Sequence, residues 1–118
     1  GRRPSEWVIG DKFNVDHGGA IPPNVIEAAN TRSSDPYQVY CRDLGITIHP
    51  ARFPREVPDF FIRFLTDEGD TILDPFAGSN MTGAVAEELK RKWISFELND
   101  EYIRGSVGRF PGVRLLQE

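Results

Sequence analysis

The sequence is poor in cysteine and has no long apolar run. A single cysteine, Cys41, stands in 118 residues, so an internal disulfide cannot form and a cysteine-rich metal site is not expected. No apolar run approaches the roughly 18 residues of a membrane span. The stretch GRRPSEWVIG at the amino-terminal end has no apolar segment typical of a secretory signal. We therefore expect a cytoplasmic protein without a membrane partner or a bound metal.

The sequence also lacks an excess of basic residues. Its 14 lysines and arginines are outnumbered by 18 acidic residues, and the formal net charge is −4. Overall charge therefore gives no support to nucleic-acid binding. Small basic groups occur near the start of the chain and at Arg52 and Arg55, and we interpret them as solvated surface.

Regular hydrophobic periodicity is missing from the first fifty residues. Turn-forming stretches such as DHGGAIPPN and NTRSSDPY favour loops, with one short helix predicted across Asp35–Leu44. The pattern changes near His49, so we divide the chain into a loop-rich lead-in, residues 1–48, and a subdomain, residues 49–118.

The segment from Pro54 onward has apolar residues at helical spacing. This spacing predicts a helix that ends near Glu68 and Gly69, where glycine suits a C-cap. Its phenylalanines, at positions 60, 61 and 64, and Trp93 are expected in the core.

Two apolar strands follow this helix. TILD, residues 71–74, has no polar alternation, so we expect a strand of a parallel sheet that is buried on both faces. A helix marked by Met81 to Leu89 separates it from a second strand, residues 92–97, and Asn99 or Asp100 caps a third helix. The predicted fold class is α/β: a partial Rossmann-like, mostly parallel sheet with flanking helices.

The loop DPFAGSN joins the first strand to the helix that follows it. Gly78 would let a ligand approach the backbone, and the helix beyond Ser79 would offer N–H groups. The lysine of a phosphate loop and the G-x-G-x-x-G spacing of a dinucleotide loop are both absent.

The charges around this loop favour a different ligand. Asp74 at the end of the first strand would repel phosphate and suit an ammonium group, and Glu97 could accept hydrogen bonds from ribose hydroxyls. S-adenosylmethionine has both an amino-acid end and a ribose. The alternative is that Asp74 only caps a helix and that Glu97 is an ordinary surface residue.

Three linked motifs resemble one enzyme family. HPARFP (49–54), FFIRFLTDEGDTILDPFAGSNMTG (60–83) and RKWISFELNDEYI (91–103) are similar to the amino-methylating DNA methyltransferases. The resemblance is strongest to the cytosine-N4 enzymes of restriction–modification systems in which the cofactor half follows the catalytic half, and DHGGAIPPNVIEAANT is also similar to that group. It implies S-adenosylmethionine as cofactor, double-stranded DNA as the substrate of the complete enzyme, and a prokaryotic or phage origin.

The resemblance also implies cofactor contacts, residue by residue. The segment that closes over the methionine end of the cofactor corresponds to His49, Ala51 and Arg52. The cofactor loop corresponds to Asp74, Phe76, Gly78 and Ser79, extended by Asn80 and Thr82, and Glu97 is the ribose acid. Met81 departs from the pattern, because these enzymes often have threonine there.

The family's catalytic motif, Ser/Asp-Pro-Pro-Tyr/Phe, is not found. Its polar groups hold the target amine and its aromatic ring stacks on a flipped base. SSDPYQ contains Asp35, Pro36 and Tyr37 but only one proline, and we interpret it as an Asp-Pro turn. The chain therefore resembles the C-terminal part of a methyltransferase.

Without this motif, we expect no catalytic residue in the chain and no activity from the chain alone. A missing catalytic half or a second copy of the chain would then complete it, and we expect the isolated chain to form homo-oligomers. The alternative is a non-catalytic binding or assembly module that uses the same fold.

Overall fold

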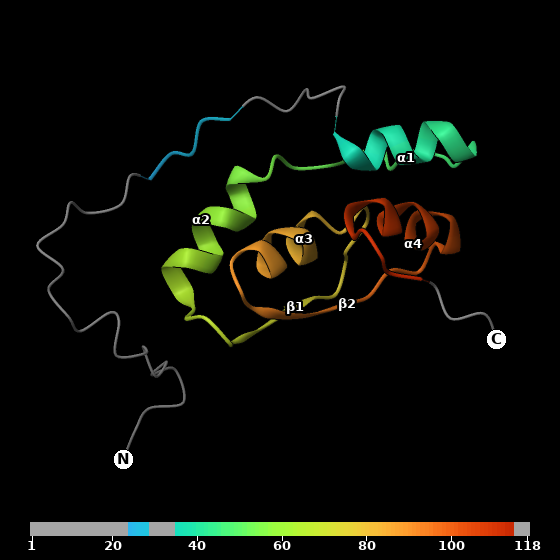
Figure 1. The fold of residues 1–118 in the computed structure, drawn as a ribbon. Helices are drawn as coiled ribbons and strands as arrows, with labels where there is room; N and C mark the ends of the chain where they lie inside the picture. The colour runs from blue at the N-terminus through green and yellow to red at the C-terminus, as the bar shows by residue number, and fades with distance from the viewer. Residues whose placement is uncertain (1–23, 29–34, 115–118) are drawn as a thin grey trace, which may run out of the picture.

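The computed structural model describes residues 24–28 and 35–114 (Figure 1). Its elements are α1 (Pro36–Leu44), α2 (Glu56–Leu65), β1 (Thr71–Asp74), α3 (Met81–Glu88), β2 (Lys92–Ser95), α4 (Asp100–Ser106) and a 3-10 turn, η2 (Val107–Arg109). The order helix, strand, helix, strand, helix from α2 onward confirms the predicted α/β class. The motif at 16–31 lies outside the described residues except for 24–28.

The two described strands form a parallel pair joined by α3. Thr71 lies opposite Lys92, and Asp74 lies opposite Ser95. The second strand ends two residues before the predicted Glu97, because the chain turns there toward the loop that follows β1. Hydrogen bonds from Phe96 N to Asp74 O and from Ala77 N to Phe96 O, both 2.9 Å, tie the two strand ends together.

The core lies on one face of this pair, beneath α2 and α3 (Figure 1). Ile62, Val85 and Ala86 are buried, and the neighbouring hydrophobic side chains pack against them: Ile72, Met81, Leu89 and Trp93. The other face is open, with Leu73 63% and Ile94 51% exposed. The prediction that 71–74 is buried on both faces is therefore wrong for this chain, because the described helices cover only one face.

The helix α2 ends earlier than predicted, at Leu65 rather than near Gly69. Thr66 Oγ1 donates to Ile62 O at 2.6 Å, and Arg91 donates to Thr66 O at 2.7 Å. These bonds satisfy the end of the helix, while Gly69 occupies the turn that leads to β1 and donates to Lys90 O. Gly69 therefore forms the turn before β1, and the prediction that it caps α2 is wrong.

The phenylalanines of α2 do not all enter the core. Phe61 is 48% and Phe64 is 39% exposed, so their predicted core placement is wrong, whereas Phe60 is half-buried. Phe60 packs edge-on against Phe61 and stacks on Phe64. Trp93 packs against the core and stacks on Phe110 at 4.8 Å, as predicted for a core residue.

The predicted helix at 35–44 is confirmed and packs on the carboxyl-terminal elements. Asp35 caps it, and Tyr37 and Cys41 are fully buried. A Cβ on Gly105 would lie 2.9 Å from Cys41 Sγ, and one on Gly108 would lie 2.5 Å from Tyr40 Cβ. The missing side chains at these glycines let α1 lie directly against α4 and η2 (Figure 1).

Within residues 24–28 and 35–114, no helix is long and apolar enough to cross a membrane. The same residues contain no group of at least three histidine, cysteine or acidic side chains arranged to hold a metal.

Candidate functional site

The loop between β1 and α3 is held by its own side chains. Asp74 Oδ1 accepts from Phe76 N at 3.0 Å, and Gly78 has a φ of +55°. Asn80 is the N-cap of α3, and its Oδ1 accepts from Gly83 N at 3.1 Å and from Ser95 Oγ at 2.8 Å. One of the N–H groups expected to face a ligand is therefore already bonded to Asn80.

Glu97 closes the carboxyl end of this loop from the segment after β2. Its Oε2 accepts from Gly78 N at 2.8 Å, and its Oε1 accepts from Asn99 N at 3.1 Å. The N–H group of Asn99, together with those of Gly78 and Leu98, lowers the pKa of Glu97, and partial burial opposes this shift. Because each carboxylate oxygen has more than one acceptor position, Glu97 can still accept hydrogen bonds from a ligand.

His49 lies over the same loop. A Cβ built on Gly78 would be 3.1 Å from His49 Nε2, so a side chain there would press on the ring, and the positive φ also disfavours one. Nδ1 accepts from Ala51 N at 3.1 Å, which in the neutral imidazole leaves the proton on Nε2, toward the loop. The ring centre also lies 4.4 Å from that of Tyr102. His49, Gly78 and Glu97 thus converge from separate parts of the chain.

The other predicted residues are distributed more widely. Ser79 is buried beside this cluster, Thr82 is half-buried in the first turn of α3, and Phe76 is 86% exposed. Ala51 is exposed. Arg52 is turned away, and its guanidinium donates hydrogen bonds to the side-chain oxygen of Gln38.

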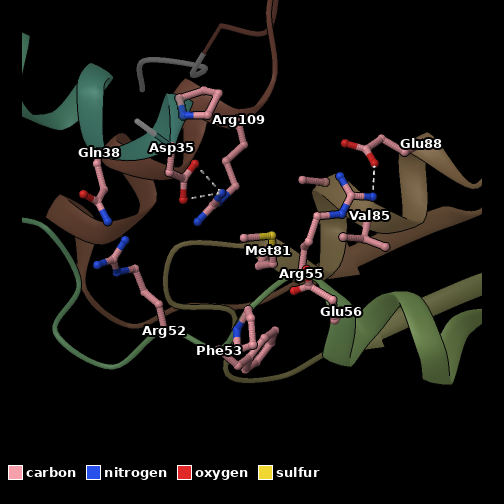
Figure 2. A pocket seen from close by; sticks show the side chains of 13 residues that line it. Asp35, Gln38, Arg52, Phe53, Arg55, Glu56, Met81, Val85, Glu88 and Arg109 are labelled. Atoms are coloured by element: carbon pink, nitrogen blue, oxygen red, sulfur yellow. Dashed lines mark hydrogen bonds and ion pairs between the residues drawn. The ribbon is translucent and has the colours of Figure 1, made fainter. Parts of the chain in front are cut away.

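Arg52 instead lines a separate pocket of about 320 Å³, which lies between the amino-terminal end of α1 and helix α3 (Figure 2). Met81 and Val85 contribute apolar surface, and the charged pairs Asp35–Arg109 and Arg55–Glu88 lie on its walls. None of His49, Gly78 and Glu97 lines this pocket. We take the cluster over the glycine loop as the candidate site, because His49, Gly78 and Glu97 converge there.

Arg109 is a site neighbour that the sequence analysis missed. It donates to Ser79 O at 2.8 Å, to Ser79 Oγ at 2.9 Å and to both oxygens of Asp35 at 3.1 and 3.2 Å. Burial lowers the pKa of Arg109, and the Asp35 carboxylate opposes that shift. Its partners are remote in sequence, and no local pattern around Gly108 and Arg109 indicates them.

Known proteins share this sequence pattern. A DNA methylase family model matches residues 12–107. The type II methyltransferase M.PvuII of Proteus hauseri is 51% identical over 116 residues, which are 98% of this chain and 34% of that protein. The DNA adenine methyltransferase YhdJ of Escherichia coli K12 is 44% identical over 61 residues, 52% of this chain and 21% of that protein.

Solved structures agree with this similarity. PvuII DNA methyltransferase (cytosine-N4-specific) superposes with a TM-score of 0.72 and 48% identity over 80% of this chain and 34% of that one. The M1.HpyAVI–SAM complex matches with a TM-score of 0.54 and 25% identity over 77% of this chain and 43% of that one. The chain thus spans about a third of the length of M.PvuII. By sequence and by fold, the chain belongs to the N6/N4 DNA methylase family.

Proposed function

We propose that this chain is the S-adenosylmethionine-binding, C-terminal portion of a site-specific DNA methyltransferase that methylates an exocyclic amine, cytosine N4. The observation that carries the proposal is the convergence of Glu97, Gly78 and His49 at the carboxyl ends of two parallel strands, where open α/β sheets bind ligands. M.PvuII is 51% identical to this chain over 98% of its length, and the similar PvuII structure is that of a cytosine-N4-specific enzyme, which favours cytosine N4 over adenine N6.

The residues of the cluster fit this cofactor. The carboxylate of Glu97 would accept hydrogen bonds from the ribose hydroxyls while it holds Gly78 in place. The missing side chain at Gly78 lets the His49 ring lie close to the loop, and Asp74 would favour the cationic amino group at the methionine end. We assign supporting contacts to His49, Ala51, Phe76, Asn80 and Thr82, and to the backbone of Ser79, whose hydroxyl bonds Arg109. Arg52 is left out, because its guanidinium bonds Gln38.

When bound, the cofactor supplies an electrophilic methyl group on a sulfonium sulfur, which the lone pair of an exocyclic amine attacks. The residues of this chain would bind and orient the donor. The groups that hold the amine and the flipped base belong to a Ser/Asp-Pro-Pro-aromatic motif, which the 118 residues do not contain. Catalysis therefore requires a second portion, while residues 1–48 would end the target-recognition region and 49–118 would form the cofactor subdomain.

A chimera tests this proposal. The segment of M.PvuII that matches this chain is replaced by the 118 residues, and methyl transfer to duplex DNA is followed by nucleoside mass spectrometry. We expect N4-methylcytosine from the chimera and none from the isolated chain. Because the motif that holds the target amine comes from M.PvuII in this chimera, N4-methylcytosine reports a working cofactor portion and does not test the target base of this chain. A folded chimera that binds the cofactor and transfers nothing would favour the alternative, a non-catalytic module.

The matched variants are Glu97→Ala and Glu101→Ala in the same chimera. Glu101 also accepts a backbone N–H, that of Thr47 at 2.8 Å, but lies outside the loop cluster. We expect the first variant to raise the KM for S-adenosylmethionine and the second to leave it unchanged. Equal effects of the two variants would contradict the site.

A further inference from the structure

A buried arginine joins the glycine loop to the start of α1. The Arg109 side chain is 5% exposed and pairs with Asp35, which is 13% exposed. The same guanidinium bonds the carbonyl and the hydroxyl of Ser79, the residue after Gly78. Figure 2 shows Arg109 paired with Asp35 at the wall of the pocket.

The arginine also lies against the residue that holds His49. Its guanidinium carbon is 4.7 Å from the centre of the Tyr37 ring, and Tyr37 is fully buried. Tyr37 Oη in turn accepts from His49 N at 2.9 Å. One connected set of contacts therefore reaches both the loop beneath the candidate site and the histidine above it.

We propose that Asp35, Tyr37 and Arg109 form a positioning unit that fixes the spacing between the glycine loop and His49, with Arg109 as its central positioning residue. The inference rests on the proposed cofactor site, whose two sides the unit connects. The positioning unit also gives the SSDPYQ segment a role. Asp35 and Tyr37 resemble part of the catalytic motif, but at the start of α1 they support Arg109 and His49.

Arginine is the side chain that this arrangement requires. Its planar fork of N–H donors bonds the carboxylate of Asp35 and both oxygens of Ser79 at once, whereas the ammonium group of lysine is a compact point charge on a flexible stem. Because Ser79 is buried, replacing the Arg109 guanidinium leaves the carbonyl and hydroxyl oxygens of Ser79 without their hydrogen-bond donor. Replacing Arg109 should therefore loosen the glycine loop.

The neighbouring pair Arg55–Glu88 provides a matched control. It lines the same pocket and has a 2.6 Å contact, but its side chains are 40% and 53% exposed and bond no atom of the loop. Arg55→Lys should therefore leave the loop unchanged, since exposed ion pairs contribute little.

The test first uses hydrogen exchange without cofactor. In Arg109→Lys, the loop loses charged hydrogen bonds from Arg109 to Ser79 and should open more often. The amide of Gly78, which donates to Glu97, should then exchange about tenfold faster, the effect of one charged hydrogen bond. Arg55→Lys should not change this rate. Tyr37→Phe removes the hydroxyl that accepts from His49 N and bonds Cys41, but keeps the aromatic ring against Arg109, so it should speed exchange at His49 and leave Gly78 near the parent rate.

The second measurement is S-adenosylmethionine affinity by calorimetry. Arg109→Lys should weaken binding about tenfold. Adding Ser79→Ala to the Arg109→Lys variant should cause little further loss of affinity, because both substitutions break the same hydrogen bond between Arg109 and the Ser79 hydroxyl. Additive losses, or parent-like exchange at Gly78 in a folded Arg109→Lys variant, would overturn the positioning role. A parent that fails to bind the cofactor overturns the proposed function instead, while the exchange result still decides the positioning unit.

Discussion

Replacing Glu97 by alanine removes one side chain that has two separable roles. In the free protein its carboxylate accepts the N–H groups of Gly78 at 2.8 Å and Asn99 at 3.1 Å. Gly78 is buried, so its N–H loses its partner, whereas Asn99 is exposed and can bond water. We estimate a cost of about 1–2 kcal/mol from the single buried donor. At roughly 4 °C per kcal/mol for a chain of this size, Tm should fall by about 4–8 °C.

Cofactor binding should suffer separately from stability. Loss of the ribose acceptor should cost a further amount on the order of 1–3 kcal/mol in binding free energy, measured by calorimetry below the lowered Tm. Glu97→Gln is the control, since its amide oxygen can still accept from Gly78 but its charge is gone. We expect its Tm to lie near the parent value and its affinity to be reduced. A Glu97→Ala variant with parent-like Tm and affinity would refute both roles.

Further predictions concern pH, activity and assembly. The pKa of Glu97 is lowered in the folded chain, so its contribution to stability should be complete above the ordinary value of 4.5 and disappear as pH falls through the lower folded value. The Tm difference between parent and Glu97→Ala, followed against pH, checks this, and a difference that grows in acid would contradict it. The isolated chain should transfer no methyl group to duplex DNA in a radiolabel assay, and robust transfer would place a catalytic role on Asp35 and Tyr37. Sedimentation equilibrium should show self-association through the open face of the sheet, where Leu73 and Ile94 are exposed. Leu73→Lys should weaken it, and a parent that stays monomeric at high micromolar concentration would refute it.

Local signals in the sequence were enough to place most elements. The strand at 71–74 was predicted with its observed bounds, and Asn99, one of the two residues predicted to cap the third helix, is the N-cap of α4. Asp35 was interpreted as an Asp-Pro turn and is the N-cap of α1. These features depend on neighbouring residues, since a cap bonds N–H groups two or three positions away. The loop cluster followed from the same logic, because parallel strands end at one edge of a sheet.

Features that depend on distant residues were missed or wrong. An apolar strand such as TILD indicates burial on both faces only if the fold supplies cover for both, and the described residues supply it for one. Arg109 was missed because its partners, Asp35 and Ser79, are 74 and 30 residues away. Arg52 was predicted from its place in the motif, but its side chain is drawn to Gln38 on α1.

The central claim is that the loop cluster binds S-adenosylmethionine, and amide NMR during a cofactor titration tests it most directly. We expect the chemical shifts to change most at Gly78 and Ser79, at residues 97–99 and at His49. The pocket lined by Arg52, about 320 Å³ in volume, provides the internal comparison. Changes centred on that pocket, or no changes at cofactor concentrations in the millimolar range, would contradict the account.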